Sequence, residues 1–255
     1  MAFVKAEKSK SKLRLAISGP SGSGKTYSAL RMATGMGGRI ALIDTEQESA
    51  SLYADKFSFD RATLDAPYTP ERCAELIKEA EQSKNYDILI FDSITHEWNG
   101  IGGCLEALNI ISRTKYKGNS YMAWNEITPR HRMFIDTMLQ SPLHIIATMR
   151  SKTAYVEVNK GERKTYQKQG VEPEQRDGIE FEFTVVLDVN NDGNFATASK
   201  DRTGLFSEPC VITEKTGENL IKWLTTGVDK NKMPENSLKD MLIEIQNSPD
   251  INSLP

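Results

Sequence analysis

The sequence predicts an α/β domain with a mainly parallel central β-sheet, helices on both faces and antiparallel hairpins toward the C-terminus. Apolar, strand-like runs alternate with segments of helical periodicity, and the first two such strands are expected at residues 13–18 and 39–43. The run at 86–91 is almost wholly apolar, which suits a strand buried on both faces. From residue 153 onward, short strands separated by turn residues indicate hairpins.

Helices are expected where capping residues precede apolar periodicity. Thr69-Pro70 supplies an N-cap and a first-turn proline for a helix that reaches about residue 80. Thr128-Pro129 is expected to open another helix in the same way. A short helix at 218–224 closes the fold.

The later strands follow the same logic. Residues 143–148 form a fourth strand, in which His144 has apolar neighbours and is expected to be a hydrogen-bonded core histidine. Residues 153–178 are expected to form a β-hairpin. Residues 179–189 are expected to form a fifth strand, paired with 195–199.

The composition is that of an ordinary globular protein, and it limits the partners and the cellular compartment that we expect. Its 255 residues carry 26% charged and 38% apolar residues with a net charge of −3, so nucleic-acid binding must come from a local patch. The three cysteines are far apart without C-x-x-C spacing, which favours a reducing compartment and argues against zinc or disulfides. No membrane-spanning run or leader is evident, so we expect a cytoplasmic protein that does not bind membranes.

Three parts are expected along the chain. Residues 1–12 are a basic N-terminal arm, and residues 13–227 are the folded α/β core. Residues 228–255 combine a polar linker with an amphipathic helix.

A phosphate-binding loop follows the first strand. The pattern G-x-x-x-x-G-K-[ST] is complete and opens directly into a helix. Glycines let several backbone N–H groups face one anion, and the helix N-terminus adds partial positive charge. Lys25 is expected to reach the β- and γ-phosphates, and the Thr26 hydroxyl to bind Mg²⁺. The expected nucleotide-binding residues are Gly19, Pro20, Ser21, Gly22, Ser23, Gly24, Lys25, Thr26 and Tyr27.

Acidic residues follow two further strands. Asp92 ends the run at 86–91, and a carboxylate placed there, downstream of a phosphate loop, is expected to order Mg²⁺. Glu46 and Glu48 follow the strand at 39–43, at the edge where open α/β sheets bind ligands. The sequence therefore predicts a site for Mg²⁺ and ATP.

These patterns together resemble the short RecA-like ATPases encoded by phages, whose better-known members act as single-strand annealing recombinases. The resemblance covers residues 10–206 through the phosphate loop, the Asp92 strand and four further motifs: 44–46, 148–152, 175–178 and Lys200-x-Arg202-x-Gly204. It implies a RecA-like core that hydrolyses ATP with Mg²⁺, in the cytoplasm of a bacterial host that carries the phage or prophage.

The same resemblance implies roles for individual residues. Glu46 would be the general base, with Glu48 as its competitor, and Lys200 and Arg202 would reach the γ-phosphate of a neighbouring subunit in a ring or filament. RecA itself has a γ-phosphate-sensing glutamine at the end of the fourth strand. This chain has Met149-Arg150 there, which suggests that Arg150 or Lys152 senses the phosphate.

Single-stranded DNA is the partner that the resemblance implies, together with a single-strand-binding or other recombination protein. Two segments mix basic and aromatic residues, which suits phosphate contacts and base stacking: 112–126, expected to be a mobile loop, and 152–178, which includes the expected hairpin. The simpler alternative for 112–126 is a surface loop whose Trp124 packs into the core. The DNA-binding residues expected from these segments are Arg113, Lys115, Tyr116, Lys117, Lys160, Arg163, Lys164 and Lys168.

Two other functions are compatible with the sequence. A nucleotide-dependent switch could bind a protein partner through the hairpin and the C-terminal helix. A small-molecule kinase could use the same phosphate loop, but it would need an arginine-rich lid and no cations from a neighbour.

Overall fold

The computed structural model describes residue 5, residues 8–160 and residues 163–228; within 153–171 it describes the backbone only. The predicted amphipathic helix at the C-terminus and most of the predicted basic arm lie outside the described residues. The chain divides into a large compact unit, Lys12–Trp223, and a small one formed by the segments up to Ser11 and from Leu224. In the small unit, Ser9 and Val228 form a parallel bridge.

A largely parallel sheet forms the centre of the large unit. Its strand order is β3-β2-β4-β5-β1-β7-β8-β9, with β6 paired to β5. The pairs from β3 through β7 are parallel, whereas β8, β9 and the β5–β6 hairpin are antiparallel. The described strands are β1 (Arg14–Gly19), β2 (Ile40–Asp44), β3 (Asp60–Thr63), β4 (Ile88–Asp92), β5 (His144–Lys160), β6 (Arg163–Pro173), β7 (Val185–Val189), β8 (Phe195–Asp201) and β9 (Cys210–Val211).

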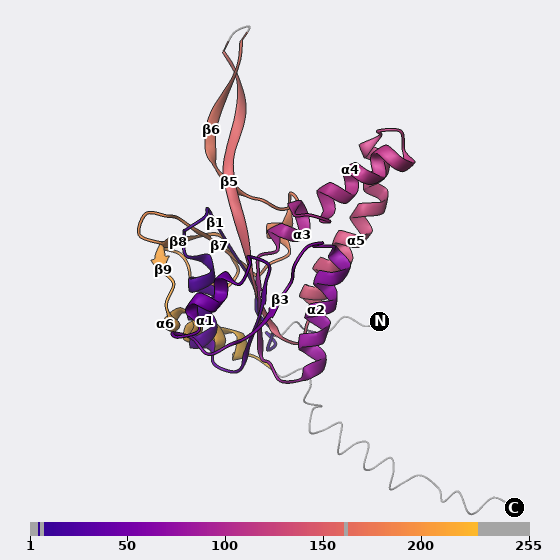
Figure 1. Ribbon diagram of the computed structural model, residues 1–255. Coiled ribbons are helices and arrows are strands. Elements are labelled where there is room, and N and C mark those ends of the chain that lie inside the picture. Colours follow the sequence, from indigo (N-terminus) through magenta and orange to yellow (C-terminus); the bar gives the residue numbers. More distant parts are fainter. Residues whose placement is uncertain (1–4, 6–7, 161–162, 229–255) are drawn as a thin grey trace, which may run out of the picture. The chain divides into compact units, whose positions relative to one another are not determined.

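Helices cover both faces of this sheet. Helices α1 and α6 lie on one face, and α2 and α5 lie on the other (Figure 1). The described helices are α1 (Lys25–Met36), α2 (Pro70–Ser83), α3 (Thr95–Asn99), α4 (Cys104–Lys115), α5 (Ser120–Gln140) and α6 (Glu214–Thr225), with 3₁₀ turns η1 (Ser49–Tyr53) and η2 (Ile179–Phe181). None of the helices in the described part of the chain is long and apolar enough to cross a membrane.

The core follows from strand alternation. Successive side chains of a strand point to opposite faces, so Ala16 packs with the α2 and α5 side while its neighbours Leu15 and Ile17 face the other way. On the second face, α1 and α6 approach closely at two glycines. A Cβ at Gly35 would lie 1.8 Å from the Glu214 carbonyl oxygen, and one at Gly217 would lie 2.0 Å from that of Met32. Only glycine permits this packing distance.

The fold class and the early strands are confirmed. Each of the predicted runs at 13–18, 39–43, 86–91 and 143–148 overlaps a strand of the sheet, and the observed strand begins one or two residues later. Thr69 caps α2 by accepting a hydrogen bond from the Arg72 amide at 3.3 Å. His144 is buried and accepts a hydrogen bond from the Leu13 amide through Nδ1 at 3.0 Å, as a satisfied core histidine does. The short edge strand β3 escaped prediction because its side chains are largely exposed and form no apolar run.

The prediction that residues 112–126 form a mobile loop was wrong. Most of this segment belongs to the two helices α4 and α5, joined by a short turn at 116–119, rather than to a mobile loop. The predicted helix start at Thr128 was also wrong, because α5 begins at Ser120 and Pro129 lies inside it. Asn119 provides the N-cap, accepting a hydrogen bond from the Met122 amide at 3.2 Å. The cap at Asn119 had already started the helix before the Thr-Pro pair.

Two strand boundaries also differ from prediction. The fourth strand does not stop before the hairpin; β5 is continuous for 17 residues and leaves the sheet as one arm of a long β5–β6 ribbon (Figure 1). Residues 179–189 are not one strand, because η2 precedes β7. The alternation of Ile179, Phe181 and Phe183 resembled a strand, yet Phe181 is 71% exposed while the other two are buried.

Candidate nucleotide site

The phosphate loop connects the end of β1 to the start of α1 at the carboxyl edge of the sheet. Gly22 and Gly24 have φ angles of 79° and 81°, a region that disfavours side chains with a Cβ. At Gly19, an added Cβ would lie 2.5 Å from both the Ser23 Oγ and the Val189 carbonyl oxygen. The loop is therefore a tight backbone cradle at a helix N-terminus, the arrangement that binds phosphate.

Two polar side chains of the loop lack a full set of hydrogen-bond partners in the described part of the chain. The Ser23 Oγ is buried and has no hydrogen-bond partner among the described residues. Lys25 Nζ donates to the Pro20 carbonyl oxygen at 2.9 Å, and burial lowers the pKa of its ammonium group. A nucleotide phosphate would supply acceptors for both groups, so the cradle fits a bound phosphate chain.

A cavity of about 410 Å³ opens in front of this cradle. Its walls combine the loop with the turn after β2, η1 and the point where β5 leaves the sheet. It is lined by Ser21, Gly22, Gly24, Lys25, Thr26, Glu46, Ser49, Leu52, Tyr53 and Arg150. Of the residues predicted from the loop, Gly19, Pro20, Ser23 and Tyr27 do not line the cavity. The ring of Tyr27 packs edge-on against Tyr53 and Phe57, at 5.5 and 5.2 Å between centroids.

Thr26 and Asp92 meet as predicted for a Mg²⁺ site. The Thr26 hydroxyl donates to Asp92 Oδ2 at 2.5 Å. Asp92 is buried, and burial raises the pKa of its carboxyl group to about 6. A buried carboxylate beside a hydroxyl offers the hard oxygen donors that Mg²⁺ prefers.

Thr148 is a site residue to which the sequence assigned no role. Its hydroxyl donates to the second oxygen of Asp92, Oδ1, from the neighbouring strand β5. It thereby fixes the orientation of the carboxylate while Oδ2 faces Thr26. The available signal was its position at the end of a predicted strand beside the Asp92 strand.

Glu46, and not Glu48, lies in the phosphate cavity. Its amide donates to Asp44 Oδ1 at 2.7 Å, which holds the turn after β2. Its carboxylate accepts a hydrogen bond from Arg150 Nε at 2.9 Å. Glu48 points to Arg61, whose guanidinium lies 3.0 Å from its carboxylate.

Arg150, and not Lys152, lines the phosphate cavity. Its amide donates to the Thr95 Oγ1 at 2.9 Å, which fixes the backbone where β5 leaves the sheet. Lys152 lies further along β5 and pairs with Glu172 at 3.2 Å. Arg150 thus lines the phosphate cavity together with Lys25 and Glu46, and it is hydrogen-bonded to Glu46.

Lys200 and Arg202 do not reach the cavity of their own chain. Lys200 is in register with Val186, and Val186 is in register with Ala16, three residues before the phosphate loop begins. Its Nζ donates to the carbonyl oxygens of Glu180 and Phe181, at 3.1 and 2.6 Å. Neither Lys200 nor Arg202 lines the phosphate cavity of its own chain.

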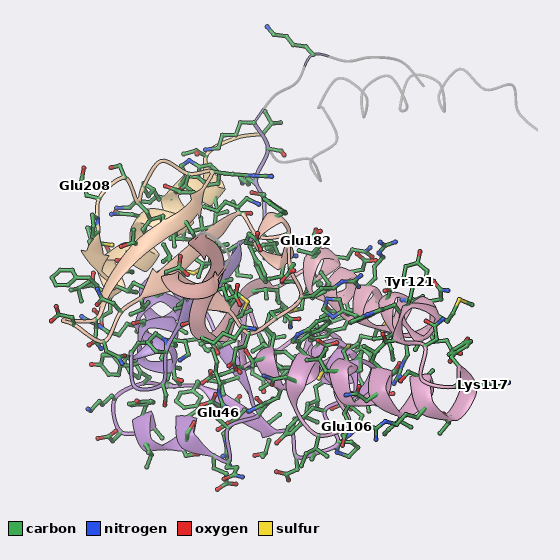
Figure 2. All side chains as sticks on the ribbon, turned by 90° about the horizontal axis from the view of Figure 1, so that it is seen from above. Glu46, Glu106, Lys117, Tyr121, Glu182 and Glu208 are labelled. Carbon is green, nitrogen blue, oxygen red and sulfur yellow. The ribbon has the colours of Figure 1, made fainter. Side chains whose placement is uncertain are left out.

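The predicted DNA-binding residues fall into two groups. Arg113, Lys115, Tyr116 and Lys117 lie at the end of α4 and in the turn after it. Lys115 Nζ and the Tyr116 hydroxyl both donate to Glu126, at 2.9 and 2.7 Å, whereas Lys117 lies at the outer tip of the helix pair, far from Glu46 (Figure 2). Lys160, Arg163, Lys164 and Lys168 belong to the β5–β6 ribbon, and their side chains lie outside the described part.

Comparison with known proteins identifies the family. The family model described as "AAA domain" matches residues 11–219. The chain belongs to the AAA domain family. This AAA domain carries a complete phosphate loop and is accordingly a P-loop ATPase of the AAA kind, a family that implies nucleotide binding.

Solved structures include a KaiC-like protein from the hyperthermophilic archaeon Pyrococcus horikoshii OT3. The two sequences are 16% identical. The structural match covers 76% of this chain and 82% of the archaeal chain, with a TM-score of 0.39. No curated protein matches the sequence.

Proposed function

We propose that this AAA domain is an ATP-hydrolysing recombination protein that acts on single-stranded DNA, in the manner of phage annealing recombinases. One observation carries the proposal: the strand that brings Arg150 to the phosphate cavity continues without a break into the projecting β5–β6 ribbon. A change at the γ-phosphate position can therefore be transmitted along one strand to a surface ribbon whose sequence carries more lysine and arginine than glutamate.

The chain's own residues divide the work of hydrolysis. The backbone of the phosphate loop and Lys25 hold the phosphates, and Thr26 and Asp92 would hold Mg²⁺, which would neutralise charge on the β- and γ-phosphates. Glu46 orients the attacking water and accepts its proton. For this Glu46 must exchange its hydrogen bond with Arg150 for one with water. Arg150 can then bind the γ-phosphate.

The remaining positive charge is proposed to come from a second copy of the chain. Lys200 lies on β8 and Arg202 directly after it, and neither lines the phosphate cavity of its own chain. Side-by-side assembly would bring them to a neighbour's γ-phosphate, where they would stabilise the charge that develops in the transition state. Hydrolysis would then depend on assembly into a ring or filament.

A nucleotide-dependent switch that binds a protein partner is the second candidate. It is favoured by the hydrogen bonds of Lys115 and Tyr116 to Glu126, because these tie two predicted DNA-binding side chains to their own helix pair. A switch of this kind would hydrolyse ATP slowly and would not respond to DNA.

Binding to a labelled single-stranded oligonucleotide separates the two candidates. At low salt, with Mg²⁺ and a non-hydrolysable ATP analogue, the proposal predicts binding that weakens steeply as salt increases, because phosphate contacts release counterions. ATP hydrolysis should rise when the DNA is added. No binding at low salt, with hydrolysis indifferent to DNA, would contradict the proposal and support the protein-binding switch.

A further inference from the structure

A second cavity lies away from the phosphate loop, between α3, α5 and the segment that follows β6. Its volume is about 640 Å³, within the range of pockets that bind small organic groups. The residues that matter below are Trp98, Tyr121, Trp124, Asn125, Arg176 and Asp177. None of them belongs to the phosphate cavity.

The two segments that the sequence marked as basic and aromatic meet at this cavity. Tyr121, Trp124 and Asn125 come from the first segment, which forms part of α5. Arg176 and Asp177 come from the end of the second segment, just beyond the β5–β6 ribbon. Sequence analysis placed these segments on separate loops, and the fold brings them to one wall.

A column of stacked side chains forms the floor. The rings of Trp98 and Trp124 are stacked, with centroids 5.8 Å apart and planes 21° from parallel. The Arg176 guanidinium lies 5.5 Å from the centroid of Trp124. No ion pair involving this guanidinium is found among the described residues, so the cation is held over an aromatic ring and not against a carboxylate.

The column rests on a buried, hydrogen-bonded support. His131 lies 5.3 Å from Trp98 between ring centroids, and its Nδ1 is 3.1 Å from Glu97 Oε1. Glu97 is fully buried and also accepts a hydrogen bond from the Cys104 thiol at 3.0 Å. Because α3, α4 and α5 each supply one member of this support, the aromatic floor is fixed in place before any ligand arrives.

The rim of the cavity is open and aromatic. Tyr121 is 81% exposed and lies on the surface of the α4–α5 helix pair (Figure 2). Asn125 follows one helical turn later and lines the same cavity. An exposed ring, a stacked cation and an amide that can donate and accept are the groups with which proteins bind unpaired nucleobases.

We infer that this cavity binds an unstacked base of single-stranded nucleic acid, and the inference rests on the function proposed above. The base stacks against Tyr121 and the plane of Arg176, while Asn125 and Asp177 hydrogen-bond to its edge. The carboxylate of Asp177 repels phosphate, so the base enters the cavity and the sugar-phosphate backbone stays outside. The cavity therefore recognises bases, whereas the ribbon contributes charge.

The test compares two labelled oligonucleotides of the same length, one of thymidine and one with abasic sites throughout, bound to the full chain with Mg²⁺ and an ATP analogue. Both carry the same phosphates, so their difference isolates base contacts. We expect the parent to bind the thymidine strand about 10-fold more tightly, as stacking of one base allows. Tyr121→Ala and Arg176→Gln should each remove most of this difference. Met122→Ala is the matched control, since Met122 is adjacent to Tyr121 and 42% exposed but does not line the cavity.

Tryptophan fluorescence provides an independent readout, because two of the three tryptophans of the chain form the floor. Quenching by the thymidine strand and not by the abasic strand supports the inference. If the parent binds both strands equally, or if Tyr121→Ala and Arg176→Gln bind the thymidine strand as the parent does, the inference is overturned while DNA binding stands. If the parent binds neither strand at low salt, the proposed function itself fails, and the inference with it.

Discussion

Arg150 donates a hydrogen bond from Nε to Glu46 Oε1 across 2.9 Å, so the proposed general base is paired with a cation in the phosphate cavity. The two residues lie 104 positions apart and are joined only by the fold. A γ-phosphate entering the cavity competes for the same guanidinium, because phosphate and carboxylate both accept charge-assisted hydrogen bonds. Nucleotide binding and release of the base are thereby linked in a single exchange of partners.

Replacing Glu46 by glutamine should separate binding from hydrolysis. Glu46→Gln keeps the shape of the side chain but cannot accept the proton of the attacking water. We expect ATP binding within a few-fold of the parent and a rate of hydrolysis lower by at least about 100-fold. Single-turnover hydrolysis and analogue binding measure the two quantities. Glu48→Gln, which alters the carboxylate that pairs with Arg61, is the control, and normal hydrolysis by Glu46→Gln would disprove the assignment.

Arg150 should distinguish ATP from ADP. Removing its guanidinium takes away a charge-assisted contact to the γ-phosphate, a loss of about 10-fold in affinity for an ATP analogue with little change for ADP. Titration of Arg150→Ala with both nucleotides checks this. Lys152→Ala should behave like the parent, because Lys152 pairs with Glu172. An equal loss for both nucleotides would mean that Arg150 supports the cavity without sensing the γ-phosphate.

Thr26 should control how strongly Mg²⁺ improves nucleotide binding. Its hydroxyl lies 2.5 Å from Asp92 Oδ2, where both oxygens can serve a metal ion. In Thr26→Ala we expect the gain in ATP affinity on adding Mg²⁺ to fall by at least about 10-fold. Affinity measured with Mg²⁺ and with a chelator gives this gain. Thr26→Ser keeps the hydroxyl and should restore it; failure of serine to do so would argue against metal coordination at this position.

His144 should make the fold sensitive to acid. Burial, together with repulsion from Lys12 and Arg14, lowers the pKa of His144 from 6.5 to about 4, and its neutral Nδ1 accepts the Leu13 amide hydrogen bond. The unfolded chain therefore binds a proton at higher pH than the folded chain does. The contribution of His144 to stability is therefore fully present above pH 6.5 and is lost as the pH falls toward 4.

Thermal unfolding across this pH range tests the role of His144. The effect at its largest corresponds to about 3 kcal/mol, from the difference in pKa. Carboxylates contribute to the same range, so the parent is compared with His144→Gln, which stays neutral and can still accept a hydrogen bond. The variant should lose less stability between pH 6.5 and 4. Identical pH profiles would show that His144 is not a main source of the acid sensitivity.

The sequence was sufficient to predict those parts of the site that lie within one contiguous segment. The phosphate loop from Gly19 to Thr26 is contiguous, and the strand that ends in Asp92 is buried along its length, so both could be predicted. The meeting of Thr26 with Asp92 followed from the rule that parallel strands present their carboxyl ends at one edge.

Contacts between distant segments could not be predicted in the same way. The pairing of Glu46 with Arg150 and the stacking of Trp98 on Trp124 depend on how β5 and α5 pack, which no local pattern encodes. Pro129 was misleading because proline marks a first turn more often than a helix interior, and here Asn119 had already capped the helix. The Glu46–Arg150 contact joins the phosphate cavity to the strand that continues into the ribbon, and the Trp98–Trp124 contact forms the floor of the second cavity.

The most direct test of the proposed function is the rate of ATP hydrolysis measured against protein concentration, with and without single-stranded DNA, for the parent and for Arg202→Ala. Arg202 does not line the phosphate cavity of its own chain, so its loss should act only through a neighbouring subunit. The proposal predicts a specific activity that rises steeply with concentration, increases with DNA and is largely lost in the variant. A specific activity that is constant with concentration, indifferent to DNA and unchanged in Arg202→Ala would contradict it.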